Sequence, residues 1–288
     1  MFLPKNVLLE RLLRVLKEDI GQGDITTALT IPPAKTVEAQ VIAKESGIIA
    51  GVEEAQLFLE SLGLKVEILV KDGAEISKGV RILKTTGDAR TLLSVERTLL
   101  NFLSRMSGIA TKTRRILAKV RRAGHNTLIA STRKTAPGLS YFDKKAVLLG
   151  GGDTHRLHLD DLILIKDNHL KIVGNLNQAL EKVKKTVSFA KKIEIEVATK
   201  EAALEAARSG ADIIMLDNFH PQHIRETIEL LEKEELREKI LIEASGGITE
   251  ANILEFAGTG VDIISLGELT HTTKALDISL DVQEPKKR

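Results

Sequence analysis

Apolar residues in the second half of the chain recur as short, nearly continuous runs separated by amphipathic segments. The runs are TLIAS (127–131), DLILIK (161–166), KIEIEV (192–197), DIIMLD (212–217), KILIEAS (239–245) and DIISLG (262–267). Helical patterns follow several of them, at 200–209, 221–233 and 250–257. Apolar strands that alternate with helices indicate a parallel sheet buried on both faces. Six such units favour an α/β barrel over an open doubly wound sheet, because Gly150–Gly152 does not match the glycine-rich nucleotide fingerprint.

The first half of the chain has a different pattern. Alternating apolar positions predict strands of an antiparallel or mixed sheet, at Val37, Ala39, Val41 and Ala43 and again at Val66, Ile68 and Val70. Residues 89–122 predict a long helix, which Gly108 is expected to interrupt. We therefore expect an N-terminal α/β sandwich domain at 1–110, a barrel domain at 111–270, and a C-terminal segment, 271–288, that returns to the N-terminal domain.

Composition narrows the classes of partner. The 42 Lys and Arg residues nearly balance the 40 Asp and Glu residues, so no overall charge attracts nucleic acid or acidic lipid. The chain contains no cysteine, which excludes disulfides and thiolate chemistry. No apolar run reaches the ~18 residues that a transmembrane helix needs, and the N-terminal segment reads as an amphipathic helix. We expect a cytoplasmic protein without nucleic-acid or membrane partners, in which any anion site is a local cluster of cations.

Such a cluster follows the predicted strands of the barrel. Arg133 and Lys134 come directly after the first strand, His155 and Arg156 follow the glycine run, and Lys166 ends the next strand. Active sites of α/β barrels lie at the carboxyl ends of the strands, so these side chains are expected to converge. Arginine fits carboxylate or phosphate with two parallel hydrogen bonds. The implied ligand carries several negative charges, while the alternative is a set of unrelated surface cations.

Two acids are placed at the ends of later strands. Glu196 closes KIEIEV and Asp217 closes DIIMLD, where a side chain points into the barrel mouth. Such a pair can bind ribose hydroxyls, hold Mg²⁺ on a pyrophosphate, or stabilise positive charge at a sugar carbon. The alternative is a salt bridge to a neighbouring lysine, for which Glu194, on the same face, is a second candidate.

The last two strands end in small residues. Ser245, Gly246 and Gly247 follow one strand, and Gly267 follows the other, with His271 close behind. Small residues let backbone N–H groups approach an anion, and a helix from Thr249 is expected to add its positive end. Loops after the last strands of α/β barrels often bind phosphate, so we expect a phosphate site here.

Motifs along nearly the whole chain resemble the quinolinate phosphoribosyltransferase family (nicotinate-nucleotide pyrophosphorylase, carboxylating). They occur in the family's order as EDIGQGDITT (18–27), ERTLLNFLSRMSGIAT (96–111), TRKTAPGL (132–139), GGGDTHRL (150–157), LIKDNH (164–169), IEVAT…MLDN (195–218) and SGGI…ISLGELTH (245–271). The resemblance implies an incomplete, seven-stranded α/β barrel beside an N-terminal α/β sheet domain. It also implies a homodimer, or a hexamer built as a trimer of dimers.

The resemblance further implies a pentosyltransferase that joins quinolinate to phosphoribosyl pyrophosphate with decarboxylation. The residues that it assigns to quinolinate are Arg133, His155, Arg156 and Lys166, with Arg97 supplied across the subunit interface. Those that it assigns to phosphoribosyl pyrophosphate and its Mg²⁺ are Lys134, Glu196 and Asp217, and with Lys166 these form the expected catalytic set. The phosphate-binding residues that it implies are Ser245, Gly246, Gly247, Gly267 and His271. No organic cofactor is expected.

Three other interpretations stay open at this point. A relative of the same family could act on another heterocyclic base, and the molybdenum-associated homologues are included among such relatives. A barrel aldolase could use Lys166 as a Schiff-base amine, but the arginines would then have no purpose. The stretch at 70–87 is similar to hairpins of lipoyl and biotin carrier domains, but it lacks the lysine of the attachment motif.

Overall fold

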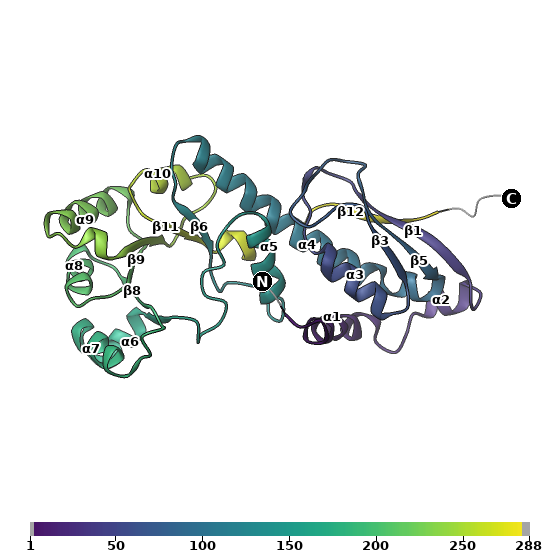
Figure 1. Ribbon diagram of the computed structural model, residues 1–288, viewed down its shortest axis with the longest axis horizontal. Coiled ribbons are helices and arrows are strands. Elements are labelled where there is room, and N and C mark those ends of the chain that lie inside the picture. The colour runs from purple at the N-terminus through teal and green to yellow at the C-terminus, as the bar shows by residue number, and fades with distance from the viewer. Residues whose placement is uncertain (1–2, 284–288) are drawn as a thin grey trace. The chain divides into compact units, whose positions relative to one another are not determined.

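The chain divides into two compact units in the computed structural model, which describes residues 3–283 (Figure 1). Among the described residues, the N-terminal unit comprises 3–112, 148–150 and 273–283, and the barrel unit comprises 113–147 and 151–272. Among the predicted boundaries, 110/111 and 270/271 lie within two residues of these divisions. Residues 284–288 of the predicted C-terminal segment lie outside the described residues.

A four-stranded antiparallel sheet organises the N-terminal unit, in the order β12-β1-β5-β3. Its strands are β1 (Thr36–Ala43), β3 (Lys65–Ile68), β5 (Arg81–Asp88) and β12 (Ile278–Val282). The C-terminal strand β12 pairs with β1, with Leu280 opposite Val41. Both side chains are buried, so the last strand contributes directly to the core of this unit. A two-stranded sheet of β2 (Gly47–Ile48) and β4 (Glu75–Ile76) adds to it.

The helices of this unit follow the apolar pattern. They are α1 (Lys5–Ile20), α2 (Ile25–Thr30), α3 (Val52–Ser61) and the first part of α4 (Ala89–Arg122). Helix α1 buries Leu8, Leu12 and Leu16, whose spacing of four residues places them on one face. The expected interruption at Gly108 was wrong, because α4 is continuous through this position. A Cβ at Gly108 would collide with the carbonyl oxygen of Lys274, so the glycine permits close packing of the segment before β12.

Parallel strands form the barrel unit, in the order β6-β11-β10-β9-β8-β7. A parallel bridge between Ala130 and Asp153 extends the sheet beyond β6. The described residues thus form six parallel strands and one isolated bridge, where the family resemblance implies seven strands. The regular strands are β6 (Leu128–Ser131), β7 (Ile163–Ile165), β8 (Ile193–Val197), β9 (Ile213–Asp217), β10 (Leu241–Ser245) and β11 (Ile263–Leu266).

Helices alternate with these strands, as the sequence predicts. They are α5 (Ser140–Leu149), α6 (Asp167–Val173), α7 (Leu176–Thr186), α8 (Lys200–Arg208), α9 (Pro221–Lys233), η1 (Arg237–Lys239), α10 (Ile253–Ala257) and α11 (Glu268–His271). One boundary was wrong: α10 begins at Ile253 instead of near Thr249, so no helix starts directly after the Ser-Gly-Gly segment. Asn252 accepts a hydrogen bond from the backbone N–H of Thr249 and closes a turn there.

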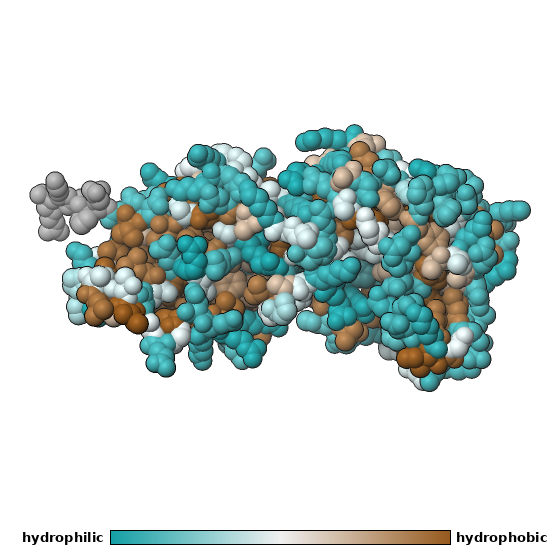
Figure 2. All heavy atoms as spheres, turned by 180° about the vertical axis from the view of Figure 1, so that it is seen from behind, coloured by the Kyte–Doolittle hydropathy of each residue, from teal (hydrophilic) through white to brown (hydrophobic). Residues whose placement is uncertain are grey.

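The face drawn in Figure 2 is mainly hydrophilic, with smaller hydrophobic areas between the polar side chains. The most exposed large apolar side chains of the described residues are Phe189, Ile172 of α6, Leu29 and Ile25 of α2, and Leu159. Within residues 3–283, no helix is both long enough and apolar enough to cross a bilayer.

Candidate active site

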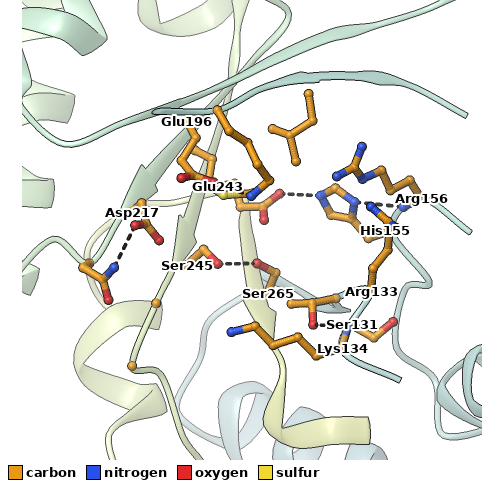
Figure 3. A pocket seen from close by; sticks show the side chains of 17 residues that line it. Ser131, Arg133, Lys134, His155, Arg156, Glu196, Asp217, Glu243, Ser245 and Ser265 are labelled. Atoms are coloured by element: carbon orange, nitrogen blue, oxygen red, sulfur yellow. Dashed lines mark hydrogen bonds and ion pairs between the residues drawn. The ribbon is translucent and has the colours of Figure 1, made fainter. Parts of the chain in front are cut away.

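A cavity of about 580 Å³ opens at the carboxyl ends of the barrel strands (Figure 3). Every strand from β6 to β11 and the loop after Asp153 contribute to it. Its lining residues are Ser131, Thr132, Arg133, Lys134, His155, Arg156, Leu164, Lys166, Glu196, Met215, Asp217, Asn218, Glu243, Ser245, Gly246, Gly247 and Ser265. The cavity therefore collects ten of the site residues that the sequence predicts.

Arg133, His155 and Arg156 lie together on one side of the cavity, and Lys134 runs along its lower edge in Figure 3. We call these four residues the cationic wall. Burial lowers the pKa of Arg156, and the positive charge of Arg133 lowers it further. Both guanidinium groups stay charged, since arginine does not lose its proton in proteins. Two like charges held close together in a partly buried place are suited to a ligand with at least two negative charges.

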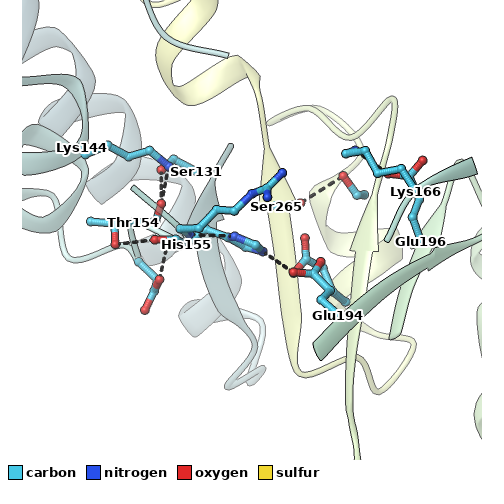
Figure 4. A network of polar contacts seen from close by, with 12 residues as sticks. Ser131, Lys144, Thr154, His155, Lys166, Glu194, Glu196 and Ser265 are labelled. Atoms are coloured by element: carbon cyan, nitrogen blue, oxygen red, sulfur yellow. Dashed lines mark hydrogen bonds and ion pairs between the residues drawn. The ribbon is translucent and has the colours of Figure 1, made fainter. Parts of the chain in front are cut away.

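The loop that carries His155 and Arg156 is fixed by a network of hydrogen bonds (Figure 4). The carbonyl oxygen of Thr154 accepts from Ser131 Oγ at 3.1 Å and from the Nζ of Lys144. The backbone N–H of His155 donates to Asp153 Oδ1 at 2.6 Å. His155 has a positive φ of 51°, which is uncommon for a residue with a side chain. The network thus holds a conformation that the loop would seldom adopt alone.

Two buried acids surround the imidazole of His155. Its Nε2 lies 2.9 Å from Glu243 Oε2 and 3.5 Å from Glu194 Oε2, and neither acid is exposed to solvent. Burial by itself would lower the pKa of His155, but hydrogen bonds and charges of Glu194 and Glu243 raise this pKa to about 10. Burial also raises the pKa of Glu194, against the effect of His155.

One contact opposes this charged state. The backbone N–H of Arg156 lies 2.8 Å from Nδ1 of His155, which suits a ring whose Nδ1 carries no proton. The two carboxylates favour the charged ring more strongly, because two negative groups beside the imidazole outweigh one neutral N–H. In both protonation states Nε2 can donate to Glu243, so the orientation of the ring is the same.

Glu196 and Asp217, which we call the acidic wall, lie on the other side of the cavity (Figure 3). Glu196 is near the end of β8, and Asp217 is the last residue of β9. Glu196 Oε2 forms a salt bridge of 2.6 Å with Lys166 Nζ. Asn218 Nδ2 donates to Asp217 Oδ2 at 2.7 Å. The salt bridge that the sequence left as an alternative for Glu196 is therefore present, and it lies within the cavity.

The segment after β10 closes the cavity between the two walls. Ser245 and Ser265, at the ends of β10 and β11, are joined by a hydrogen bond of 3.0 Å. Gly246 has a φ of 92°, and a Cβ there would collide with the side-chain oxygen of Asn218 and come within 2.8 Å of its backbone nitrogen. Only glycine suits this position, which places the backbone of Gly246 and Gly247 at the surface of the cavity.

Comparisons with known proteins identify the family of the chain. Two family models match the chain: quinolinate phosphoribosyl transferase, N-terminal domain, over residues 24–107, and the C-terminal domain over residues 109–281. The chain belongs to the quinolinate phosphoribosyl transferase family. This bears out the resemblance that the sequence motifs suggest.

Curated relatives and solved structures of the family cover nearly the whole chain. A probable nicotinate-nucleotide pyrophosphorylase (carboxylating) from Methanocaldococcus jannaschii is 47% identical over 280 residues, which is 96% of this chain and 98% of the relative. One from Methanothermobacter thermautotrophicus is 45% identical over 93% of this chain and 96% of the relative. The structure of the nicotinate-nucleotide pyrophosphorylase from Francisella tularensis matches with a TM-score of 0.89 and 35% identity over 98% of each chain.

Three residues that the family resemblance assigns to the site do not line the cavity. Arg97 is an exposed residue of α4 in the N-terminal unit, and its expected role in a partner subunit stays a prediction. Gly267 and His271 lie behind Lys134: a Cβ at Gly267 would come within 2.9 Å of both side chains. Thr270 Oγ1 donates to the carbonyl oxygen of Lys134 at 2.7 Å. The segment after β11 thus supports Lys134.

Sequence reasoning missed two of the most deeply buried polar residues at this site. Glu243 lies in the middle of β10 and was read only as part of an apolar run. Lys144 of α5 was not considered, although three successive charged residues, 143–145, interrupt an otherwise apolar helix. A charged residue within a buried helix or strand is the signal that could have identified Glu243 and Lys144. A buried charge is retained only where hydrogen-bond or ion-pair partners compensate for its burial.

Proposed function

We propose that this family member transfers the phosphoribosyl group of phosphoribosyl pyrophosphate to quinolinate and releases CO₂. The products are nicotinate mononucleotide, CO₂ and pyrophosphate. The observation that carries the proposal is one cavity with a cationic wall for two carboxylates and an acidic wall for a sugar and its metal ion. The names of the relatives, nicotinate-nucleotide pyrophosphorylase (carboxylating), support the same reaction.

In this proposal Arg133, His155 and Arg156 of the cationic wall bind quinolinate. Arg133 and Arg156 each offer a planar fork of donors to a carboxylate, and His155 adds a third cationic donor. Lys166, directly after β7, also lines the cavity and forms a salt bridge with Glu196. These four cationic groups would bind the two carboxylates of the substrate and orient its ring nitrogen toward the sugar.

The acidic wall and the Ser-Gly-Gly segment would bind phosphoribosyl pyrophosphate. Carboxylate oxygens are the ligands that Mg²⁺ prefers, and Glu196 and Asp217 are the carboxylates on this side of the cavity. Mg²⁺ would enter with the substrate and balance charge on the pyrophosphate. Backbone groups of Gly246 and Gly247, with Ser245, would hold the 5′-phosphate, and Lys134 would contact the leaving group.

The chemistry then needs position and charge more than a reactive side chain. Pyrophosphate leaves the sugar and the developing positive charge at C1 is stabilised by the acidic wall. The pyridine nitrogen attacks C1, and the quaternised ring stabilises the carbanion that remains when the adjacent carboxylate leaves as CO₂. A proton at this carbon completes nicotinate mononucleotide. No covalent intermediate with the protein is required.

The Schiff-base alternative has no supporting observation. Its nucleophile would be a neutral amine at Lys166, but this ammonium group is held in a salt bridge with Glu196. The oligomeric state, the contribution of Arg97 from a partner subunit, and the cytoplasmic location remain part of the proposal.

The test is a reaction of purified protein with quinolinate, phosphoribosyl pyrophosphate and Mg²⁺, in which nicotinate mononucleotide and CO₂ are measured. Nicotinate replaces quinolinate in the control. Product from quinolinate alone supports both the dicarboxylate pocket and decarboxylation. Product from nicotinate at an equal rate, or from neither base, would contradict the assignment of the cationic wall.

A further inference from the structure

We propose that Lys144, a residue outside the cavity, is a positioning residue for the dicarboxylate site. Its hydrogen bond to the carbonyl oxygen of Thr154 would hold the next two residues, His155 and Arg156, in the orientation that binds the ligand. This inference rests on the function proposed above. Lys144 does not line the cavity, so it would act through the loop of residues 153–156 instead of touching the substrate.

The burial of Lys144 is the first observation. Its side chain has no exposure to solvent, which is rare for lysine unless the ammonium group has a specific partner. The partner in this structure is the backbone carbonyl oxygen of Thr154, to which Nζ donates. Because a buried ammonium is costly, a lysine kept here with a backbone carbonyl as its hydrogen-bond acceptor indicates a role that an apolar residue could not fill.

The position of that carbonyl is the second observation. Thr154 immediately precedes His155, whose φ of 51° is strained for a residue with a Cβ. On one side of this residue, Lys144 and Ser131 both donate hydrogen bonds to the carbonyl oxygen of Thr154 (Figure 4). On the other side, Thr154 Oγ1 donates to the carbonyl oxygen of His155 at 2.8 Å. Loss of the Lys144 contact would let the backbone relax. His155 and Arg156 would then turn away from their present directions.

Helix α5 also supports the loop that carries Arg133 and Lys134, through Asp143. Asp143 is also fully buried, and its Oδ2 accepts from the backbone N–H of Ala136 at 3.3 Å, in the loop that follows Arg133 and Lys134. Adjacent residues of one helix thus contact both loops of the wall. This placement explains why successive charged residues occupy the buried part of α5.

The charge of Lys144 gives the proposal a second readout. Burial is the main cause that lowers the pKa of Lys144 to about 8. The positive charges of Arg133 and Arg156 lower this pKa further, and the negative charges of Asp153 and Asp143 raise it. A dianion bound to the two arginines would cancel their effect. The pKa of Lys144 would then rise, and the protein would take up a proton when quinolinate binds near pH 8.

The experiment compares wild-type protein with Lys144→Met, which keeps the length of the side chain but removes its charge and donors. We expect the KM for quinolinate to rise about tenfold or more and the KM for phosphoribosyl pyrophosphate to change less than about threefold. Lys184→Met is the matched control, because Lys184 Nζ donates to the carbonyl of Ser209 at 2.5 Å, away from the cavity. It should leave both constants unchanged.

Calorimetry of quinolinate binding at pH 8, in buffers of different ionisation enthalpy, gives the second measurement. Wild-type protein should take up a fraction of a proton and Lys144→Met should not. An unchanged KM in Lys144→Met, or wild-type binding without proton uptake, would overturn the role of Lys144. The wild-type result decides alone if the variant does not fold. Wild-type protein that neither binds nor converts quinolinate would instead refute the proposed function.

Discussion

The two walls of the cavity are built in different ways. Glu196 and Asp217 of the acidic wall belong to strands β8 and β9, so the hydrogen-bonded sheet itself determines where they lie. The cationic wall stands on loops after β6 and after Asp153, and it depends on buried side chains that support those loops. A wall carried by strands needs little further support, whereas a wall carried by loops needs its own polar network.

The walls also differ in what substrate binding must change. Arg133 and Arg156 lie near each other with like charge, so a dicarboxylate relieves their repulsion. Glu196 already has a partner in Lys166 at 2.6 Å, and its side chain is only 15% exposed. A metal ion or sugar can use Glu196 fully only when this salt bridge is shared or opened. The cationic wall can therefore bind its ligand as it stands. In the acidic wall, Glu196 must first exchange its salt bridge with Lys166 for a contact with the ligand.

Removal of an arginine should have the largest effect and should act on one substrate. Arg133→Ala or Arg156→Ala is expected to lower kcat/KM for quinolinate by about tenfold to about 150-fold, since a hydrogen bond to a charged group contributes ~1.5–3 kcal/mol. The KM for phosphoribosyl pyrophosphate should change little. Steady-state kinetics with each substrate varied in turn measures both.

Two controls accompany the arginine variants. Circular dichroism should show an intact fold, and Arg156→Lys, which keeps the charge but not the planar fork, should recover part of the loss. An equal loss for both substrates would mean that the walls do not divide the substrates between them.

Neutralisation of the acidic wall should have a smaller effect on the other substrate. Glu196→Gln keeps the shape of the side chain, but it removes a charge that faces Mg²⁺ in the proposed complex and releases Lys166. We expect the KM for phosphoribosyl pyrophosphate to rise by about tenfold, with a higher Mg²⁺ requirement. The KM for quinolinate should stay the same or fall, because Lys166 becomes available to a carboxylate.

Titration of activity with Mg²⁺ checks this second prediction. Glu205→Gln, an exposed change of the same type on α8, is the matched control and should behave as wild type. If the KM for quinolinate rises together with the KM for phosphoribosyl pyrophosphate, the salt bridge between Lys166 and Glu196 contributes to the binding of both substrates.

The same difference between the walls explains what the sequence could reveal. Apolar runs predicted all six regular strands of the barrel, and residues at the ends of these strands, such as Glu196 and Asp217, were placed correctly in one cavity. Arg133, His155 and Arg156 were also brought together as expected. Strand ends are predictable because a buried parallel sheet imposes one direction on every strand.

The supports of the loops could not be predicted in the same way. The contact of Lys144 with Thr154 joins a helix to a loop, and no periodic pattern specifies such a pair. The positive φ of His155 likewise depends on Ser131 and Asp153, not on its own propensity. The course of the chain past Gly108 was also misread, because the reason for that glycine is a contact with Lys274, far along the sequence. Tertiary contacts between distant segments decide these features.

Gly246→Ala should have an effect of intermediate size on the segment between the walls. The new Cβ would strain a backbone with a φ of 92° and displace Asn218, which donates to Asp217. Strain at such a residue costs about 1–3 kcal/mol, so we expect a lower unfolding temperature and a severalfold higher KM for phosphoribosyl pyrophosphate. Differential scanning calorimetry and kinetics measure the two. A changed KM for quinolinate alone would contradict the placement of this segment beside the acidic wall.

Glu243→Gln tests the support beneath the cationic wall, and we expect the smallest effect on activity together with an effect on stability that depends on pH. Because the folded pKa of His155 is about 10, above its ordinary value of 6.5, the stability that this residue contributes is fully present below pH 6.5 and is lost as the pH rises to about 10. Glu243→Gln removes one cause of the raised pKa. The variant should therefore be less stable than wild type at pH 7, and the difference should narrow toward pH 10.

Urea unfolding of both proteins at pH 7, 8, 9 and 10 measures this difference, using buffers of about equal ionic strength to keep screening constant. The lowered pKa of Lys144 affects both proteins in the opposite sense, with stability gained as the pH rises above about 8, so it cancels when one curve is subtracted from the other. A difference that stays constant with pH would show that His155 is neutral. The N–H of Arg156 beside Nδ1 would then define its state, and Glu243 would act only as a hydrogen-bond acceptor that orients the ring.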